Sequence, residues 1–163
     1  MEEAPSHKYF SFQKMTLAGV TCAALPVVGG ALVAASTMHT ADTWYAGLSK
    51  PTGTPPPWVF GPVWTVLYVL MGYAAYRVWV RGGNLSICIL QLGLNYAWTY
   101  LFFGKHDVRA ACWDVLILLI CVAYMTYSFA HTDPVAGYLV MPYLVWTAYA
   151  AYLTLALRQA NGL

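Results

Sequence analysis

Charged side chains are scarce in this chain of 163 residues, because Asp, Glu, Lys and Arg together make up only 9% of it. Soluble domains carry charge on roughly a quarter of their residues. The scarcity therefore excludes a water-soluble globular protein. The net charge is only +2 and the eight basic residues are dispersed, so a nucleic-acid-binding surface is excluded as well.

Charge is missing altogether from five long stretches. No Asp, Glu, Lys or Arg lies between Lys14 and Asp42, Lys50 and Arg77, Arg81 and Lys105, Asp114 and Asp133, or Asp133 and Arg158. A spanning helix needs about 20 apolar residues to cross ~30 Å of hydrocarbon, so each stretch accommodates one helix and none accommodates two. Segment 115–122 is apolar on every face, whereas a barrel strand would alternate. We predict an all-α polytopic membrane protein, a single domain over residues 1–163 built as a five-transmembrane-helix bundle. The spans are expected at about 15–37, 58–80, 84–103, 110–130 and 134–157.

Paired cysteines and metal-ligand motifs are also missing. All four cysteines fall within the predicted spans without paired spacing, which is typical of buried apolar packing: Cys22, Cys88, Cys112 and Cys121. His39, His106 and His131 show no ligand spacing, so no metal site is predicted. Asp114 has no nearby base or nucleophile and is interpreted as a charge at the start of the fourth helix, paired with Lys50 or Arg109 or favoured by the helix dipole. We therefore predict no catalytic residues and no enzyme.

Topology signals leave the orientation open. The N-terminal segment is acidic and lacks the basic region of a cleaved signal peptide, so the first span is expected to be retained. With five spans, four basic residues fall on each side of the membrane, and the positive-inside rule needs an excess.

The connection between the first two spans, residues 40–57, is rich in proline and aromatic residues. Pro51 and prolines 55–57 fix φ and remove backbone donors, which predicts an extended, ordered segment. Trp44 and Tyr45 are either anchors at the lipid headgroups or a latch. We expect this segment to be a lid over the mouth of the bundle, shaped by Trp44, Tyr45, Pro51 and Pro55.

Helical spacing gathers aromatic and amide side chains into stripes. On the third span, Gln91, Asn95, Trp98 and Phe102 share one face. Similar stripes occur on the second and fifth spans: Phe60, Trp64, Tyr68 and Met71; and Pro142, Trp146, Tyr149 and Leu153. The helix directions place Trp64, Trp98 and Trp146 at similar depth, in the lid half. The stripes indicate either helix packing tied by Asn95 or a cavity for a large, flat, apolar ligand.

Four blocks of sequence carry a resemblance to a known family. They are Pro26–Gly30, the segment from Trp44 to Tyr76, the segment from Gln91 to Gly104, and Pro142–Ala150. In order and spacing they resemble the translocator protein family, also called peripheral-type benzodiazepine receptor or tryptophan-rich sensory protein. Gly53 departs from the pattern, since many members have Trp there.

The resemblance implies a receptor that binds porphyrins or other tetrapyrroles, sterols and benzodiazepine-type drugs in a pocket under the first loop, and that is implicated in their transport or regulation. Protoporphyrin IX or haem would be a ligand, and no cofactor is required. The family's pocket positions fall on Ala34, Phe60, Gly61, Val63, Trp64, Trp98, Trp146, Ala150 and Leu153. Its fourth-helix wall falls on Ala110, Trp113 and Ile117, where the usual Trp is absent and Trp113 replaces a small residue. Asn95, from the amide stripe, joins the predicted ligand-binding set.

The resemblance also bears on location, partners and alternatives. It implies the mitochondrial outer membrane in a eukaryote, or a bacterial membrane. A homodimer is expected through small-residue faces, with Gly19, Ala23 and Gly30 on the first span and Gly93 and Ala97 on the third. The C-terminal sterol pattern is not met, because no Leu or Val occupies the five positions before Tyr152. Two alternatives remain, namely light-dependent porphyrin breakdown with Trp64 and Trp146 as redox partners, and a structural or regulatory membrane partner with an incidental pocket.

Overall fold

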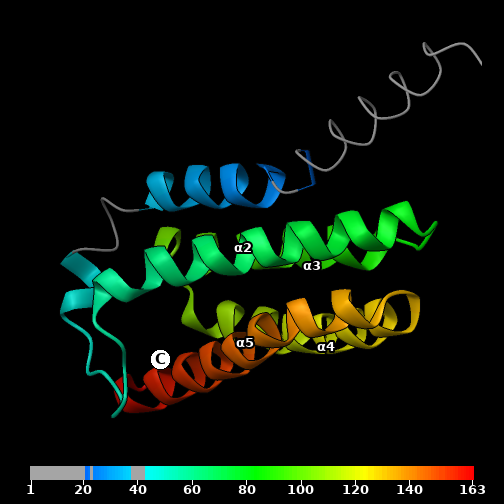
Figure 1. Cartoon of the computed structure of the whole chain (residues 1–163). Helices are drawn as coiled ribbons and strands as arrows, with labels where there is room; N and C mark the ends of the chain where they lie inside the picture. Colours follow the sequence, from blue (N-terminus) through cyan, green and yellow to red (C-terminus); the bar gives the residue numbers. More distant parts are fainter. Residues whose placement is uncertain (1–20, 23, 38–42) are drawn as a thin grey trace, which may run out of the picture.

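The chain folds into a bundle of helices that run side by side (Figure 1). The computed structural model describes residues 21, 22, 24–37 and 43–163. Four described helical segments are long and apolar enough to cross a membrane. They are α2 (Pro57–Val80), α3 (Ser86–Thr99) with its π-helical extension η1 (Tyr100–Gly104), α4 (Val108–Thr132) and α5 (Pro134–Asn161). A shorter apolar helix, Ala24–Thr37, precedes them, and the start of the predicted first span lies outside the described residues. The protein is thus an all-helical polytopic bundle.

Local sequence explains where the helices begin and end. α2 and α5 each begin with a proline, which the first helical turn tolerates because its N–H groups have no helical partner. Asp107 caps α4 by accepting a hydrogen bond from the Ala110 N–H at 2.9 Å. The cap is therefore Asp107, and Asp114 lies in the second turn, so our interpretation of Asp114 as the starting charge was wrong. Asp114 forms no ion pair with the described basic residues, and its Oδ2 is buried without a hydrogen-bond partner among the described groups.

An ion cluster around a buried carboxylate joins the end of α2 to the corner between α4 and α5. Asp133 is only 2% exposed and caps α5 through the Val135 N–H. Its carboxylate accepts from Arg77 at 2.6 Å and lies 2.7 Å from Arg81. The Arg77 guanidinium holds the pKa of Asp133 below its usual value, against the opposing effect of burial. Asp133 therefore stays ionised and fixes the end of the bundle away from the lid.

The first helix packs on α2 and α3 through its glycines. A side chain at Gly30 would collide with the ring of Tyr68, and one at Gly29 would collide with Tyr96. The Tyr96 hydroxyl also donates to the Pro26 carbonyl at 3.0 Å. These close contacts set the first helix against the bundle at its middle, and one face of the helix, from Val27 to Thr37, borders a cavity.

Candidate ligand cavity

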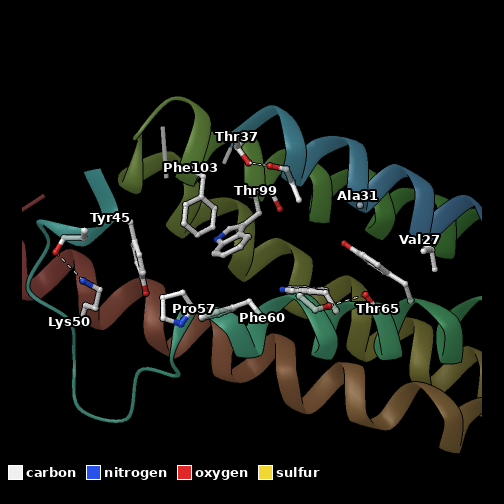
Figure 2. A pocket seen from close by; sticks show the side chains of 17 residues that line it. Val27, Ala31, Thr37, Tyr45, Lys50, Pro57, Phe60, Thr65, Thr99 and Phe103 are labelled. Atoms are coloured by element: carbon white, nitrogen blue, oxygen red, sulfur yellow. Dashed lines mark hydrogen bonds between the residues drawn. The ribbon is translucent and has the colours of Figure 1, made fainter. Parts of the chain in front are cut away.

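A cavity of about 650 Å³ lies between the first helix, α2 and α3, beneath the lid. Pockets of this size hold drug-sized molecules. The first helix contributes Val27, Ala31 and Ala34; the lid contributes Tyr45 and Lys50; α2 contributes Phe60, Gly61, Trp64 and Tyr68; and α3 with η1 contributes Trp98, Thr99 and Phe103. Figure 2 shows Tyr45, Lys50 and Pro57 at one end, Val27 and Ala31 toward the other, and Phe60, Thr99 and Phe103 between them.

Indole and phenyl rings form the walls of the cavity. Trp98 stacks on Phe102 with ring centroids 5.3 Å apart and an interplanar angle of 18°. Trp64 packs edge to face with Trp146 at 6.5 Å, and Trp146 also contacts Phe60 at 6.0 Å. The indole nitrogens of Trp98 and Trp146 are buried and have no hydrogen-bond partner among the described residues. Because buried indole N–H groups usually find an acceptor, these two nitrogens are exceptions within the described part of the chain.

A layer of polar side chains supports the cavity from inside the bundle. Tyr68 donates to the Asn95 side-chain oxygen, and the Asn95 amide donates to the Tyr143 hydroxyl at 3.3 Å. Tyr143 donates in turn to Gln91 at 2.6 Å. Asn95 is only 1% exposed, and its side-chain oxygen and nitrogen each have a partner in this network. It therefore fixes the ring of Tyr68, which faces the cavity, and does not itself line it.

The described part of the lid, residues 43–57, makes two sets of contacts with the bundle, one near its start and one farther along. Trp44 stacks on His106 with centroids 4.2 Å apart, and Tyr45 meets the rings of Phe102 and Phe103 edge to face. Farther along, Ser49 and Asn161 exchange two hydrogen bonds of 2.9 Å, and the Tyr149 hydroxyl donates to the Gly53 carbonyl. The lid thus packs against η1 on one side and α5 on the other.

The predicted site residues fall into three groups. Those that line the cavity are Ala34, Tyr45, Phe60, Gly61, Trp64 and Trp98. Val63, Asn95 and Trp146 lie behind its wall, packed in the core or hydrogen bonded there. Outside the lining are Trp44, Pro51, Pro55, Trp113, Ala150 and Leu153. Trp113 is 66% exposed on the outer surface of α4, and no residue of α4 lines this cavity.

Sequence reasoning missed several lining residues, Lys50 above all. Lys50 stands within the block Lys50-Pro51 that carried the family resemblance, so the signal was present, but Lys50 was considered only as a possible partner of Asp114. Phe103 was hidden because the π-helical turn η1 shifts the register after Thr99, which regular helical spacing does not anticipate. Thr99 follows Asn95 by four residues, so regular spacing could have placed it on the same face. The described residues contain no group of His, Cys, Asp or Glu that could hold a metal ion.

Comparisons with known proteins point to one protein family. A model of the TspO/MBR family matches residues 22–159. The chain is 39% identical to the tryptophan-rich protein TspO of Archaeoglobus fulgidus over 77% of this chain and 85% of the relative. It is 39% identical to the human translocator protein over 72% of this chain and 75% of the relative. It is 38% identical to the tryptophan-rich sensory protein of Cereibacter sphaeroides over 74% of this chain and 78% of the relative.

Proposed function

This chain belongs to the TspO/MBR family, and from that premise we propose that it is a membrane receptor that binds porphyrins and other flat, apolar molecules in the cavity beneath its lid. The observation that carries the proposal is the cavity of about 650 Å³, walled by Trp64, Trp98 and Phe60. Aromatic walls favour flat ring systems, because rings stack offset or edge to face on indoles. Related flat molecules, including sterols and benzodiazepine-type drugs, would use the same walls.

Saturable binding tests the proposal. Purified protein in lipid nanodiscs is titrated with protoporphyrin IX while tryptophan fluorescence is recorded. Quenching that saturates at one ligand per chain is expected, because Trp64 and Trp98 lie at the cavity wall. Quenching that rises without saturation, as in protein-free nanodiscs, would favour the alternative of a structural or regulatory membrane partner with an incidental pocket.

A second candidate function is light-dependent breakdown of a bound porphyrin. The specific observation in its favour is the edge-to-face pair of Trp64, at the cavity wall, and Trp146 behind it, 6.5 Å apart. Indoles that close to an excited macrocycle are suited to exchange electrons with it. Illumination of the saturated complex would then bleach the porphyrin faster in the wild type than in Trp64→Phe. Equal bleaching would leave the receptor as the sole function proposed.

Assembly and location complete the proposal. Of the residues expected to form a dimer face on the first span, Gly19 and Ala23 lie outside the described residues, and the space beside Gly30 is filled by the ring of Tyr68. A side chain at Gly93 on α3, in contrast, would meet nothing within 4 Å. We therefore propose a homodimer through the α3 face that contains Gly93, since small residues let helices approach closely. Crosslinking in bilayers that yields monomer at every protein density would contradict it. In a eukaryotic cell the proposed location is the mitochondrial outer membrane, and in a bacterium it is a bacterial membrane.

A further inference from the structure

A single charged side chain, that of Lys50, lines the cavity among the described residues. We propose that Lys50 binds an anionic group of the ligand at the lid end, so that the cavity selects apolar molecules that carry a carboxylate and orients their apolar body toward Val27. This inference rests on the proposed function, since it specifies which members of the ligand class bind best and in which direction.

The Lys50 ammonium group is held at the mouth of the cavity by its neighbours. It donates to the carbonyls of Ala46 at 3.2 Å and Leu48 at 3.4 Å, and it lies 4.9 Å from the centre of the Tyr45 ring. An ammonium group has three hydrogens, so these two carbonyls leave donor capacity for a ligand. The backbone contacts also restrict the side chain, which lowers the entropy lost when a ligand binds.

The charge of Lys50 is not neutralised by a described carboxylate. The ion pairs among the described residues are those of Asp133 with Arg77 and Arg81, at the other end of the bundle. The remainder of the cavity wall is apolar or aromatic, apart from hydroxyl groups such as that of Thr65. Lys50 is exposed at the mouth of the cavity, so water screens its charge in part, but the apolar wall beside it lets it attract an anion more strongly than it would in bulk water.

The same arrangement fixes the direction of the ligand. Lys50 and Tyr45 lie at one end of the cavity, and Val27 lies toward the other (Figure 2). A carboxylate at the Val27 end would be buried without a partner, which costs several kcal/mol in an apolar setting. The carboxylate therefore faces the lid, and the apolar ring system extends past Phe60 and Trp98.

Tyr45 adds a second donor beside Lys50. Its ring borders the cavity, and burial, with a smaller effect of Tyr149, raises the pKa of its hydroxyl. The phenol therefore stays protonated at neutral pH and can donate a hydrogen bond to the oxygen of a ligand. Lys50 and Tyr45 together form an anion-binding end on a cavity that is otherwise apolar.

Comparison of a free acid with its ester tests the assignment. Dissociation constants for protoporphyrin IX and its dimethyl ester are measured in phosphatidylcholine nanodiscs for the wild type, Lys50→Gln and Lys50→Arg. Lys50→Gln is expected to weaken binding of the free acid about three- to tenfold, the scale of a charge-assisted contact that is partly exposed to water. Binding of the ester should be unchanged, and Lys50→Arg should retain the preference for the acid. Each ligand is compared only with itself, so its partition into the bilayer cancels.

Lys105→Gln is the matched control. Lys105 also lies over a tyrosine ring, 5.6 Å from the centre of Tyr100, but it does not line the cavity. Its loss should leave both ligands unaffected. The assignment is overturned if Lys50→Gln weakens the acid and the ester equally, which would give Lys50 only a role in shaping the lid, or if it weakens neither.

Two further results separate this inference from its alternatives. Phosphatidylglycerol in the nanodiscs could abolish the effect of Lys50→Gln on binding of the free acid. In that case a lipid headgroup binds the Lys50 ammonium group, and the assignment to a carboxylate ligand is overturned. If neither porphyrin binds saturably to any variant, the proposed function itself fails. Saturable binding of the ester with no effect of Lys50 would instead leave the proposed function standing.

Discussion

At the scale of single residues, the indoles differ in what surrounds them. Trp98 lines the cavity, is 9% exposed and stacks on Phe102, while Trp146 packs behind the wall against Phe60 and Trp64. Trp113, by contrast, is 66% exposed on the outside of α4. The three side chains are chemically identical, so they allow a comparison in which only position changes.

Replacing Trp98 with Ala should weaken protoporphyrin binding by about 1–3 kcal/mol, the scale of a lost aromatic stacking surface. The measurement is a titration followed by porphyrin absorbance, which does not depend on the number of tryptophans. Trp113→Ala is the control and should bind as the wild type does. A wild-type affinity in Trp98→Ala, with the protein still folded, would remove Trp98 from the site.

The residues also show how far the site could be predicted from sequence. Spacing placed Trp98 and Phe102 on one face, and the structure stacks their rings. Spacing also placed Asn95 on that face, yet the Asn95 side chain is hydrogen bonded to Tyr68 and Tyr143 beneath the cavity. Spacing fixes which residues share a face, but it does not fix what that face meets. This ambiguity is large in a membrane protein, because lipid and protein interior are both apolar. The apolar pattern of a helix such as α4 therefore does not show which of its faces points toward the bundle.

At the scale of elements, the lid is held by contacts outside the cavity. Trp44 stacks on His106, which is the one described non-glycine residue with positive φ, at 57°. Trp44 also meets Phe102 edge to face at 5.5 Å. The lid thus packs on η1 and His106 through Trp44, while the prolines restrict the conformations of the segment that follows.

Loss of the lid's packing should speed ligand release. Trp44→Ala, and separately Pro51→Gly with Pro55→Gly, should raise the dissociation rate of a porphyrin more than they lower its association rate, as changes within one binding site usually do. Stopped-flow release is the measurement. Trp58→Ala is the control, because Trp58 lies in the first turn of α2 near the lid but is 75% exposed. An unchanged release rate in both lid variants would make the segment a simple connection.

The opposite end of the bundle depends on Asp133. The pKa of this carboxyl is lowered in the folded protein, chiefly by Arg77. A lowered folded-state pKa gives stability that is complete above the ordinary carboxyl value of about 3.9 and is lost as the pH falls through the folded-state value. We therefore expect the Tm of the wild type to fall as the pH is lowered from about 3.9 through the folded-state pKa of Asp133. In Asp133→Asn the Tm at neutral pH should already be lower, and its further fall in acid should be smaller. Asp107→Asn is a control for a helix cap without an arginine partner, and identical pH profiles for Asp133→Asn and the wild type would contradict the account.

The transmembrane helices can be predicted well from sequence, because a segment that crosses the hydrocarbon of a bilayer must be apolar and almost free of charge. Charge-free stretches predicted spans at 58–80 and 134–157, and the helices run Pro57–Val80 and Pro134–Asn161. The third helix departs within its last turn, where η1 forms π-helical structure that spacing cannot foresee. Helix ends were less predictable than helix existence, since they depend on single caps such as Asp107.

At the scale of the whole molecule, one chain by itself forms the cavity, between the first helix, α2, α3 and the lid. Two helical glycines allow a comparison between a position that lines the cavity and one that does not. Gly61 on α2 lines the cavity, and Gly93 on α3 does not. A side chain at either position would meet nothing within 4 Å in the structure, so each tolerates a larger residue without strain. Both lie within helices, where replacement of Gly also favours the helical conformation.

The most direct test fills the cavity from Gly61. Protoporphyrin titration of Gly61→Leu in nanodiscs should show affinity reduced at least tenfold, because the leucine side chain occupies the space between Phe60 and Trp64 that the ligand needs. Gly93→Leu should bind with the affinity of the wild type, even where it disrupts the proposed dimer. Undiminished binding in Gly61→Leu, with Gly93→Leu also unaffected, would contradict the account and place the ligand outside this cavity.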